Sequence, residues 1–184
     1  EVLRSQRKLF NCYGRVFDPA HPDLVGAYPW QAEFHAAGAR FKQRGLLCAN
    51  QVGKSYCGAA EMAIHLCGEY PPWWEGRRFK EPIRAWIGSE TTEASRDTMQ
   101  AALLGPQGAW GTGWIPASRI IGKPSPRQAG VANVVETIMV RHNSGGISQC
   151  SLKCHPAGSR VLMADGEWRS IETVRVGEYI LCAD

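Results

Sequence analysis

The fold is decided by the stretch Leu46-Leu47-Cys48-Ala49-Asn50-Gln51-Val52-Gly53-Lys54-Ser55, which joins a short apolar run to the triplet Gly-Lys-Ser. The apolar run predicts a buried strand over residues 46–49. Residues 56–67 are rich in small and apolar side chains and predict a helix. A strand, a loop ending in Gly-Lys-Ser and a helix, in this order, form the context that a phosphate-binding loop requires.

The chemistry of such a loop assigns a role to each residue type. Backbone N–H groups at the start of the helix would surround the phosphates, assisted by the helix dipole. Lys54 would reach the β- and γ-phosphates of ATP as a catalytic residue, and the Ser55 hydroxyl would hold Mg²⁺. The predicted nucleotide-binding residues are Gln31, Asn50, Gln51, Val52, Gly53, Lys54 and Ser55. Cys48 occupies the place of the first glycine of the standard motif, so an ordinary strand-to-helix turn remains the alternative.

A second group of candidate residues precedes the loop, in Tyr28-Pro29-Trp30-Gln31, and leads into a predicted helix over residues 32–41. The Gln31 amide has a donor and an acceptor and can form two hydrogen bonds to an adenine edge. An aromatic residue such as Trp30 can stack on the base, although a core position is the equally weighted alternative for a tryptophan.

The middle of the chain alternates strand and helix patterns, which favours an α/β fold with a mostly parallel sheet. The predicted elements are a strand over residues 83–89, a helix capped by Thr91 or Thr92 that ends at 104–106, and two strands over 134–141 and 146–152. Because residues 143–146 read as a tight turn, the last two strands are predicted to form a hairpin.

The sequence changes character at Cys154, without a polar linker. Residues 161–163 predict a short strand, Ala164-Asp165-Gly166 a turn, residues 167–169 a returning strand and residues 179–182 another strand. Because three short strands cannot bury a core of their own, the tail is also compatible with the edge of a larger β domain, with Cys154 as an ordinary apolar residue.

Composition adds modest limits. The formal net charge is +4, and the charge is uneven: residues 1–153 carry 18 Lys and Arg against 12 Asp and Glu, and residues 154–184 carry three against five. A mildly basic first part permits contact with nucleic acid without requiring it. The seven cysteines have no framework spacing and are read as reduced thiols, with a metal site as a weaker alternative. No apolar run is long enough to predict a transmembrane helix.

The first part resembles the ATPase domain of phage terminase large subunits, the motors that package DNA into capsids. The resemblance covers roughly residues 25–153 and is carried by Tyr28-Pro29-Trp30-Gln31, the loop Asn50 to Ser55, Trp86-Ile87-Gly88-Ser89 and Ser151-Leu152-Lys153. It implies a P-loop NTPase-type fold, here incomplete, with ATP and Mg²⁺ as cofactors. Many members have an arginine in the loop, where this chain has Asn50 and Gln51. The family's acidic Walker B strand and nuclease carboxylates do not occur in these residues, so we expect ATP binding with negligible turnover.

The second part, residues 154–184, resembles the N-terminal splicing block of inteins, of the Hedgehog/intein family. The carriers are Cys154, Gly158-Ser159-Arg160-Val161, Asp165-Gly166 and residues 171–181. The resemblance implies a short all-β N-terminal piece of an intein fold, with Cys154 as the splicing nucleophile that converts the Lys153–Cys154 amide to a thioester. The family's Thr-x-x-His block and terminal Asn are absent from 154–184, so this segment is not expected to splice alone. The two predicted domains are therefore 1–153 and 154–184.

The combined interpretation is the N-terminal fragment of a DNA-packaging ATPase interrupted by an intein. Both ends read as internal to a longer protein. The terminase resemblance implies double-stranded DNA, the phage portal and the small terminase subunit as partners, no membrane, and the cytoplasm of a phage-infected or prophage-bearing bacterium as the location. The intein resemblance implies the missing intein and extein portions as partners. Two alternatives stay open: another intein-interrupted P-loop protein of helicase or recombinase type, and a non-catalytic interaction domain.

Overall fold

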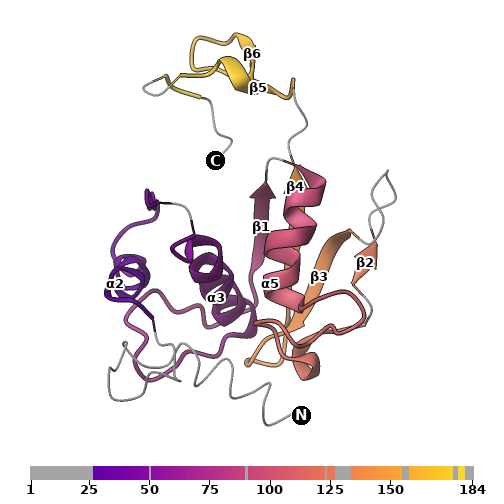
Figure 1. Ribbon diagram of the computed structural model, residues 1–184. Coiled ribbons are helices and arrows are strands. Elements are labelled where there is room, and N and C mark those ends of the chain that lie inside the picture. The colour runs from indigo at the N-terminus through magenta and orange to yellow at the C-terminus, as the bar shows by residue number, and fades with distance from the viewer. Residues whose placement is uncertain are drawn as a thin grey trace.

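The computed structural model describes residues 27–49, 51–89, 91–122, 124–126, 134–154, 158–175 and 178–180. Two sheets and a layer of helices make up this part of the chain (Figure 1). The helices are α2 (Pro29–Ala37), α3 (Lys54–Cys67), α4 (Thr92–Ala94) and α5 (Ala101–Leu104), with η2 (Ser95–Gln100), η3 (Ala117–Arg119) and η4 (Ile171–Thr173) as π or 3-10 turns. The strands are β1 (Arg84–Ser89), β2 (Ser125–Pro126), β3 (Val135–Arg141), β4 (Ile147–Cys154), β5 (Arg160–Leu162) and β6 (Trp168–Ser170).

The larger sheet has the order β1-β4-β3-β2 and is mixed. β1 runs parallel to β4, whereas the pairs β3/β4 and β2/β3 are antiparallel. The predicted hairpin of β3 and β4 is thus confirmed. The prediction of a mostly parallel sheet is wrong for the described residues, because a hairpin necessarily contributes antiparallel strands and only one crossover places strands in parallel.

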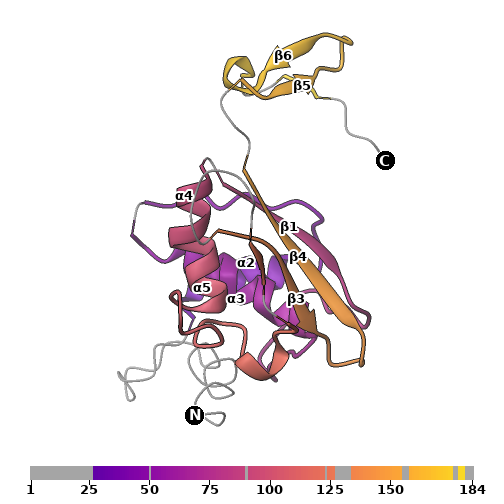
Figure 2. The same cartoon turned by 90° about the vertical axis from the view of Figure 1, so that its right-hand side faces the viewer.

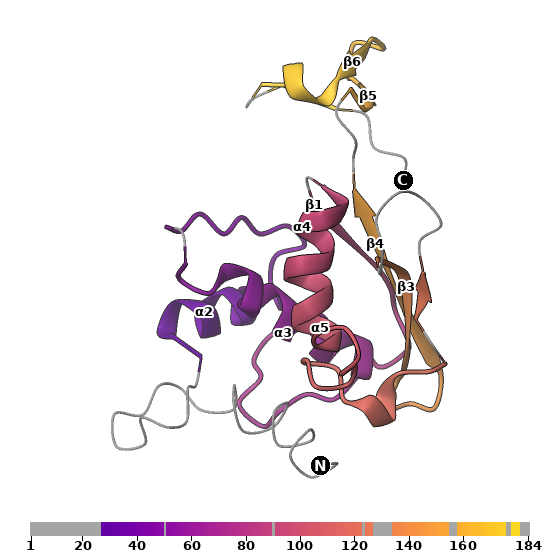
Figure 3. The ribbon, with the colours of Figure 1, turned by 45° about the vertical axis from the view of Figure 1, so that its right-hand side comes forward.

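The helices cover one face of this sheet. α2, α3 and α5 lie on the same side of it (Figures 2 and 3). Buried apolar side chains such as Ile87, Ile138 and Val140 pack with the small residues of α3 and with Leu103 into one core. On the other face Trp86 is 79% exposed. The sheet therefore has one covered face within the described residues.

The formation and the end of the central helix α3 are explained by its own residues. Its interior is rich in alanine, which favours helix, and its buried face has the small residues that allow close packing against the sheet. It ends at Gly68, which has φ 65°. A Cβ at this position would lie 2.1 Å from Nε2 of His142, so both the left-handed backbone and the close contact require glycine.

The predicted strand over residues 46–49 is not formed. These residues have no regular secondary structure, and Leu47 is 99% exposed. A strand must satisfy its backbone groups with a neighbouring strand. In the described sheet β1 is an edge strand, with β4 on one side, and residues 46–49 do not pair with its other edge. The apolar run can be recognised from neighbouring residues alone. Pairing with another strand depends on residues that are distant in the sequence.

The other helix predictions are confirmed with shifted ends. α2 begins at Pro29, three residues before the predicted start. Thr91 is the N-cap of α4, where its Oγ1 accepts a hydrogen bond from the Ala94 N–H at 3.1 Å. The following helical segment ends at Leu104 and Gly105, as predicted.

The tail forms a sheet of its own, in which β5 and β6 pair antiparallel, as predicted. The turn at 164–166 is stabilised by Asp165, whose Oδ1 accepts from the Glu167 N–H at 2.9 Å. Of the predicted last strand, Ile180 forms an isolated bridge with Met163, and residues 181–184 lie outside the described residues.

Candidate functional site

The loop that leads into α3 is closed by its own lysine. Lys54 is the first residue of α3, and its Nζ donates to the carbonyl oxygens of Cys48 at 2.7 Å and of Ala49 at 2.5 Å. The loop therefore curls around the Lys54 ammonium. These carbonyls are neutral acceptors near the surface, and a phosphate oxygen is a stronger partner for an ammonium group.

The backbone of the loop adopts unusual conformations. Gln51 has φ 62° and Gly53 has φ 90°, both in the left-handed region. Gly53 is also the N-cap residue of α3. The N–H groups of the first turn of any helix have no carbonyl partner within the helix, and such groups bind anions at helix starts. Glycine adopts the left-handed conformation without strain, whereas strain at a non-glycine residue such as Gln51 is commonly found at binding sites.

The remaining predicted loop residues lie around this turn. Val52 is half-buried, and Ser55 is exposed on the first turn of α3. Asn50 lies outside the described residues. The described part of the loop thus leaves the Ser55 hydroxyl accessible, beside Lys54 in the sequence.

Gln31 lies against the loop from α2. Its Oε1 accepts from the Tyr28 N–H at 2.9 Å, and its Nε2 donates to the Gly53 carbonyl at 3.4 Å. The side chain is buried. Gln31 therefore ties the start of α2 to the start of α3, and its predicted role toward adenine stays a prediction. Trp30 next to it is half-buried.

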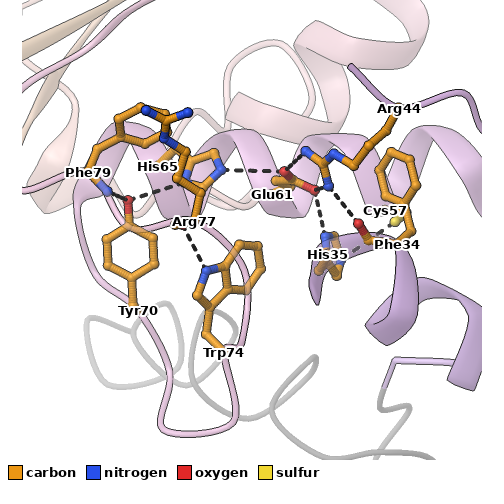
Figure 4. A network of polar contacts seen from close by, with 10 residues as sticks. All are labelled: Phe34, His35, Arg44, Cys57, Glu61, His65, Tyr70, Trp74, Arg77 and Phe79. Carbon is orange, nitrogen blue, oxygen red and sulfur yellow. Dashed lines mark hydrogen bonds and ion pairs between the residues drawn. The ribbon is translucent and has the colours of Figure 1, made fainter. Parts of the chain in front are cut away.

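A second polar cluster lies further along α3 and was not predicted from the sequence (Figure 4). Its centre is the Glu61 carboxylate, which contacts His35 Nδ1 at 2.7 Å and Arg44 Nη2 at 2.5 Å. His65, one turn along the helix, approaches Glu61 at 3.4 Å. The Glu61 cluster joins α2, α3 and the segment that follows α2.

The electrostatics of the Glu61 cluster are set by these partners. Burial alone would raise the pKa of Glu61, but hydrogen bonds from His35, His65 and Arg44 hold it well below its usual value. Glu61 is therefore ionised in the folded protein. A signal for the cluster exists in the sequence, because Glu61 stands alone among small apolar residues on the helix.

Cys57 completes a row of side chains with His35 and Glu61. Its Sγ lies 3.5 Å from His35 Nε2. This order resembles that of a nucleophile, a base and an orienting carboxylate. The Cys57 side chain is fully buried, however, so a substrate does not reach it in this structure. The row serves packing between α2 and α3.

The other site prediction, Cys154, lies at the junction of the two sheets. It is the last residue of β4 and is in register with Ser89 of β1. The next described strand, β5, belongs to the other sheet. Cys48, Cys57, Cys67 and Cys150 are free thiols, and burial raises the pKa of Cys67 and Cys150 to about 12.

Together these features define an α/β unit with a lysine-closed loop at the start of its central helix. The chain is homologous to the large terminase subunit of Salmonella phage P22, with 38% identity over 152 residues. The match covers 71% of this chain and 30% of that protein, so the chain spans less than a third of its relative. No family model and no solved structure matches the chain. Among the described residues, no helix has the length and apolar character needed to cross a bilayer.

Proposed function

We propose that this chain is the nucleotide-binding N-terminal part of a phage DNA-packaging ATPase. The observation that carries the proposal is the loop before α3, in which Lys54 Nζ is held by the Cys48 and Ala49 carbonyls at the start of a 14-residue helix. The homology to a large terminase subunit supports it independently. In the complete protein, double-stranded DNA, the portal and the small subunit are the proposed partners.

Binding of ATP would give the Lys54 ammonium group new hydrogen-bond partners. The Lys54 ammonium turns from the two carbonyls to the β- and γ-phosphates of ATP, where the charge-assisted hydrogen bonds are stronger. The N–H groups at the start of α3 would donate hydrogen bonds to the remaining phosphate oxygens. The Ser55 hydroxyl is placed to hold the Mg²⁺ that accompanies the nucleotide. Gln31 keeps the loop attached to α2 through the Gly53 carbonyl.

A titration with a fluorescent ATP analogue tests the loop assignment. Lys54→Ala should weaken binding by about tenfold or more, equivalent to about 1.4 kcal/mol. Lys80→Ala is the matched control, because it removes an exposed lysine outside the loop and should leave the affinity unchanged. Equal affinities of the wild type and Lys54→Ala would rule the assignment out.

We also propose that the Lys153–Cys154 bond is a splice junction. The favouring observation is the change of sheet at Cys154, the last residue of β4. In the first step a bond forms between Cys154 Sγ and the Lys153 carbonyl carbon, the peptide C–N bond breaks, and the leaving amine takes up a proton. The proton donor and the final cyclising residue would come from the remainder of the intein.

Mass spectrometry tests the junction. When the matching remainder of the intein and a thiol are supplied, a product ending at Lys153 should form. Cys154→Ala should abolish this product, and Cys48→Ala, which removes an exposed thiol elsewhere, should preserve it. Cleavage at this bond in Cys154→Ala, or an intact bond in a properly associated complex, would contradict the proposal.

A further inference from the structure

A solvent-open groove lies beside the Glu61 cluster, on the side of α3 that faces α2. It encloses a cavity of about 320 Å³. Its aromatic lining residues are Phe34, Phe41 and Phe79, and its cationic ones are Lys42, Arg44 and Arg77. We call this site the basic groove. Its contacts on α3 run from Gly58 to His65, one to three turns beyond Lys54, so it is distinct from the phosphate-loop candidate.

The charge of the basic groove is positive on both sides. The segment 38–44 on one side contains Arg40, Lys42 and Arg44 and no acidic residue. The segment 77–80 on the other side contains two arginines and a lysine, although Glu75 and Glu81 flank it. The one carboxylate in the lining, Glu61, is neutralised by Arg44 and held by His35.

The cations that remain are available to a ligand. Lys42 and Arg77 have no ion pair within the described part of the chain, and both are exposed. Arg44 also donates to the Phe34 carbonyl at 2.6 Å, which fixes the segment that carries Lys42. The Glu61 cluster thus holds one wall of the groove in place.

The aromatic side chains narrow the class of ligand. Phe41 is 56% exposed. Three arginines lie over the three phenylalanine rings, at 4.5 Å for Arg44 over Phe34, 5.2 Å for Arg77 over Phe79 and 5.5 Å for Arg40 over Phe41. Accessible rings and guanidinium planes stack on nucleic-acid bases, and neighbouring cations bind the phosphates.

The size of the cavity supports the same conclusion. A volume of about 320 Å³ lies at the lower end of the range of about 300–1,000 Å³ that is typical of small-ligand pockets. It suits one base at a time. A duplex keeps its bases stacked and would present only phosphates to the rim, so it would leave the rings unused. A single strand can place a base in the hollow and its phosphates on Lys42 and Arg77.

We propose that the basic groove binds single-stranded polynucleotide, with one base against Phe41 or Phe79 and the flanking phosphates on Lys42 and Arg77. This inference does not depend on ATP binding. The phenylalanines distinguish it from a merely cationic surface, because a polyanion without apolar or planar groups would gain nothing from them.

Fluorescence anisotropy on the full chain tests the proposal. The probe is a labelled oligothymidylate of about ten nucleotides, within the usual site size of single-strand binders. An oligouridylate, a duplex of equal length and polyglutamate are compared with it. The single strands should bind about tenfold more tightly than the duplex and polyglutamate. The two single strands differ in the 2′-hydroxyl and in the thymine methyl group, so equal affinity for both would show that the groove recognises neither group.

The variants separate stacking from charge. Phe41→Ala should weaken single-strand binding by about tenfold, as expected for the loss of one stacked base, and Phe41→Trp should restore it. Lys42→Ala and Arg77→Ala should weaken every polyanion and each lower the salt dependence by roughly one released counterion. Tyr179→Ala and Arg175→Ala remove an exposed ring and an exposed cation from the hairpin region and serve as controls.

Two results would overturn the proposal. Equal affinity for single strand, duplex and polyglutamate, with no change in Phe41→Ala, would show a surface that recognises charge alone. Loss of binding in Lys54→Ala but not in Phe41→Ala would assign the oligonucleotide to the phosphate loop. Because Phe41 is exposed, its substitution should leave the unfolding midpoint unchanged, which a melting curve of each variant verifies.

Discussion

The four-stranded sheet and the β5/β6 hairpin are held together by different contacts. The sheet packs against α3 and α5 through a continuous cluster of buried apolar side chains. In the described part of the tail, residues 158–175 and 178–180, Met163 alone is buried. A two-stranded hairpin is marginally stable by itself. Two regions with equally regular backbones can therefore differ widely in how much each side chain contributes to the free energy of unfolding.

Two ion clusters, one in each region, also differ in burial and in the sign of their central charge. Glu61 is a buried carboxylate surrounded by Arg44, His35 and His65. Arg169 is a guanidinium surrounded by Asp165, Glu167 and Glu178, all well exposed. Each has one central charge and three partners, but only in the first is the central charge buried. Burial of the central charge, rather than the number of its partners, should therefore decide how much the loss of that charge lowers the stability of the fold.

The largest expected effect comes from the core of the sheet. Ile138→Ala should lower the free energy of unfolding by about 4 kcal/mol, because Ile138 is fully buried and its loss leaves a cavity. Val161→Ala in β5 is the matched change in the hairpin and should cost less than about 1 kcal/mol, since Val161 is only half-buried. Urea unfolding followed by circular dichroism measures both. Similar losses would show that the hairpin has an equally well packed core.

The buried ion cluster should come next. Glu61→Gln should destabilise the fold by about 3 kcal/mol, because it leaves the buried His35 ring and the half-buried Arg44 guanidinium without their carboxylate partner. Glu33→Gln removes an exposed carboxylate of α2 and should have little effect. The same unfolding experiment compares them. If Glu61→Gln were as stable as the wild type, the cluster would be structurally dispensable.

The sequence predicted those elements whose causes are local. The small-residue run of α3, the cap at Thr91 and the turn at Asp165-Gly166 each need only neighbouring residues, and each was found. The strand over 46–49 failed because a strand needs a partner, and partner choice is decided by the whole sheet. Lys54 could be singled out by its motif, although its contacts to the loop carbonyls could not.

The Glu61 cluster could not be predicted because its contacts join distant positions. His35 lies 26 residues before Glu61, and Arg44 lies 17 residues before it. An isolated Glu in an apolar helix indicates that some partner exists, but it does not say which. For the same reason the basic groove was invisible in the sequence, since its two cationic segments meet only after α2 and α3 pack.

A smaller effect is expected from acid. The folded protein holds the pKa of Glu61 below its unfolded value of about 4.3, so its contribution is fully present above about pH 5 and is lost as the pH falls below that value. The difference in unfolding free energy between the wild type and Glu61→Gln should therefore shrink as the pH is lowered from 6 toward 3. Denaturant curves at several pH values measure it. A difference that stayed constant with pH would mean that Glu61 acts through packing and not through its charge.

The smallest effect on stability is expected from a substitution at Arg169, which tests directly whether the exposed cluster contributes less than the buried Glu61 cluster. Arg169→Gln removes the centre of three ion pairs, with Asp165 at 2.9 Å, Glu178 at 2.8 Å and Glu167 at 3.5 Å. Because these groups are in contact with water, the loss of attraction is largely offset by hydration and by freed side-chain motion. The midpoint of thermal unfolding should not shift measurably at physiological salt. At low salt, where screening is weak, a small decrease should become detectable. Glu61→Gln, measured alongside, should show a decrease that changes little with salt. A large, salt-independent decrease for Arg169→Gln would mean that the hairpin is packed against something that shields this cluster.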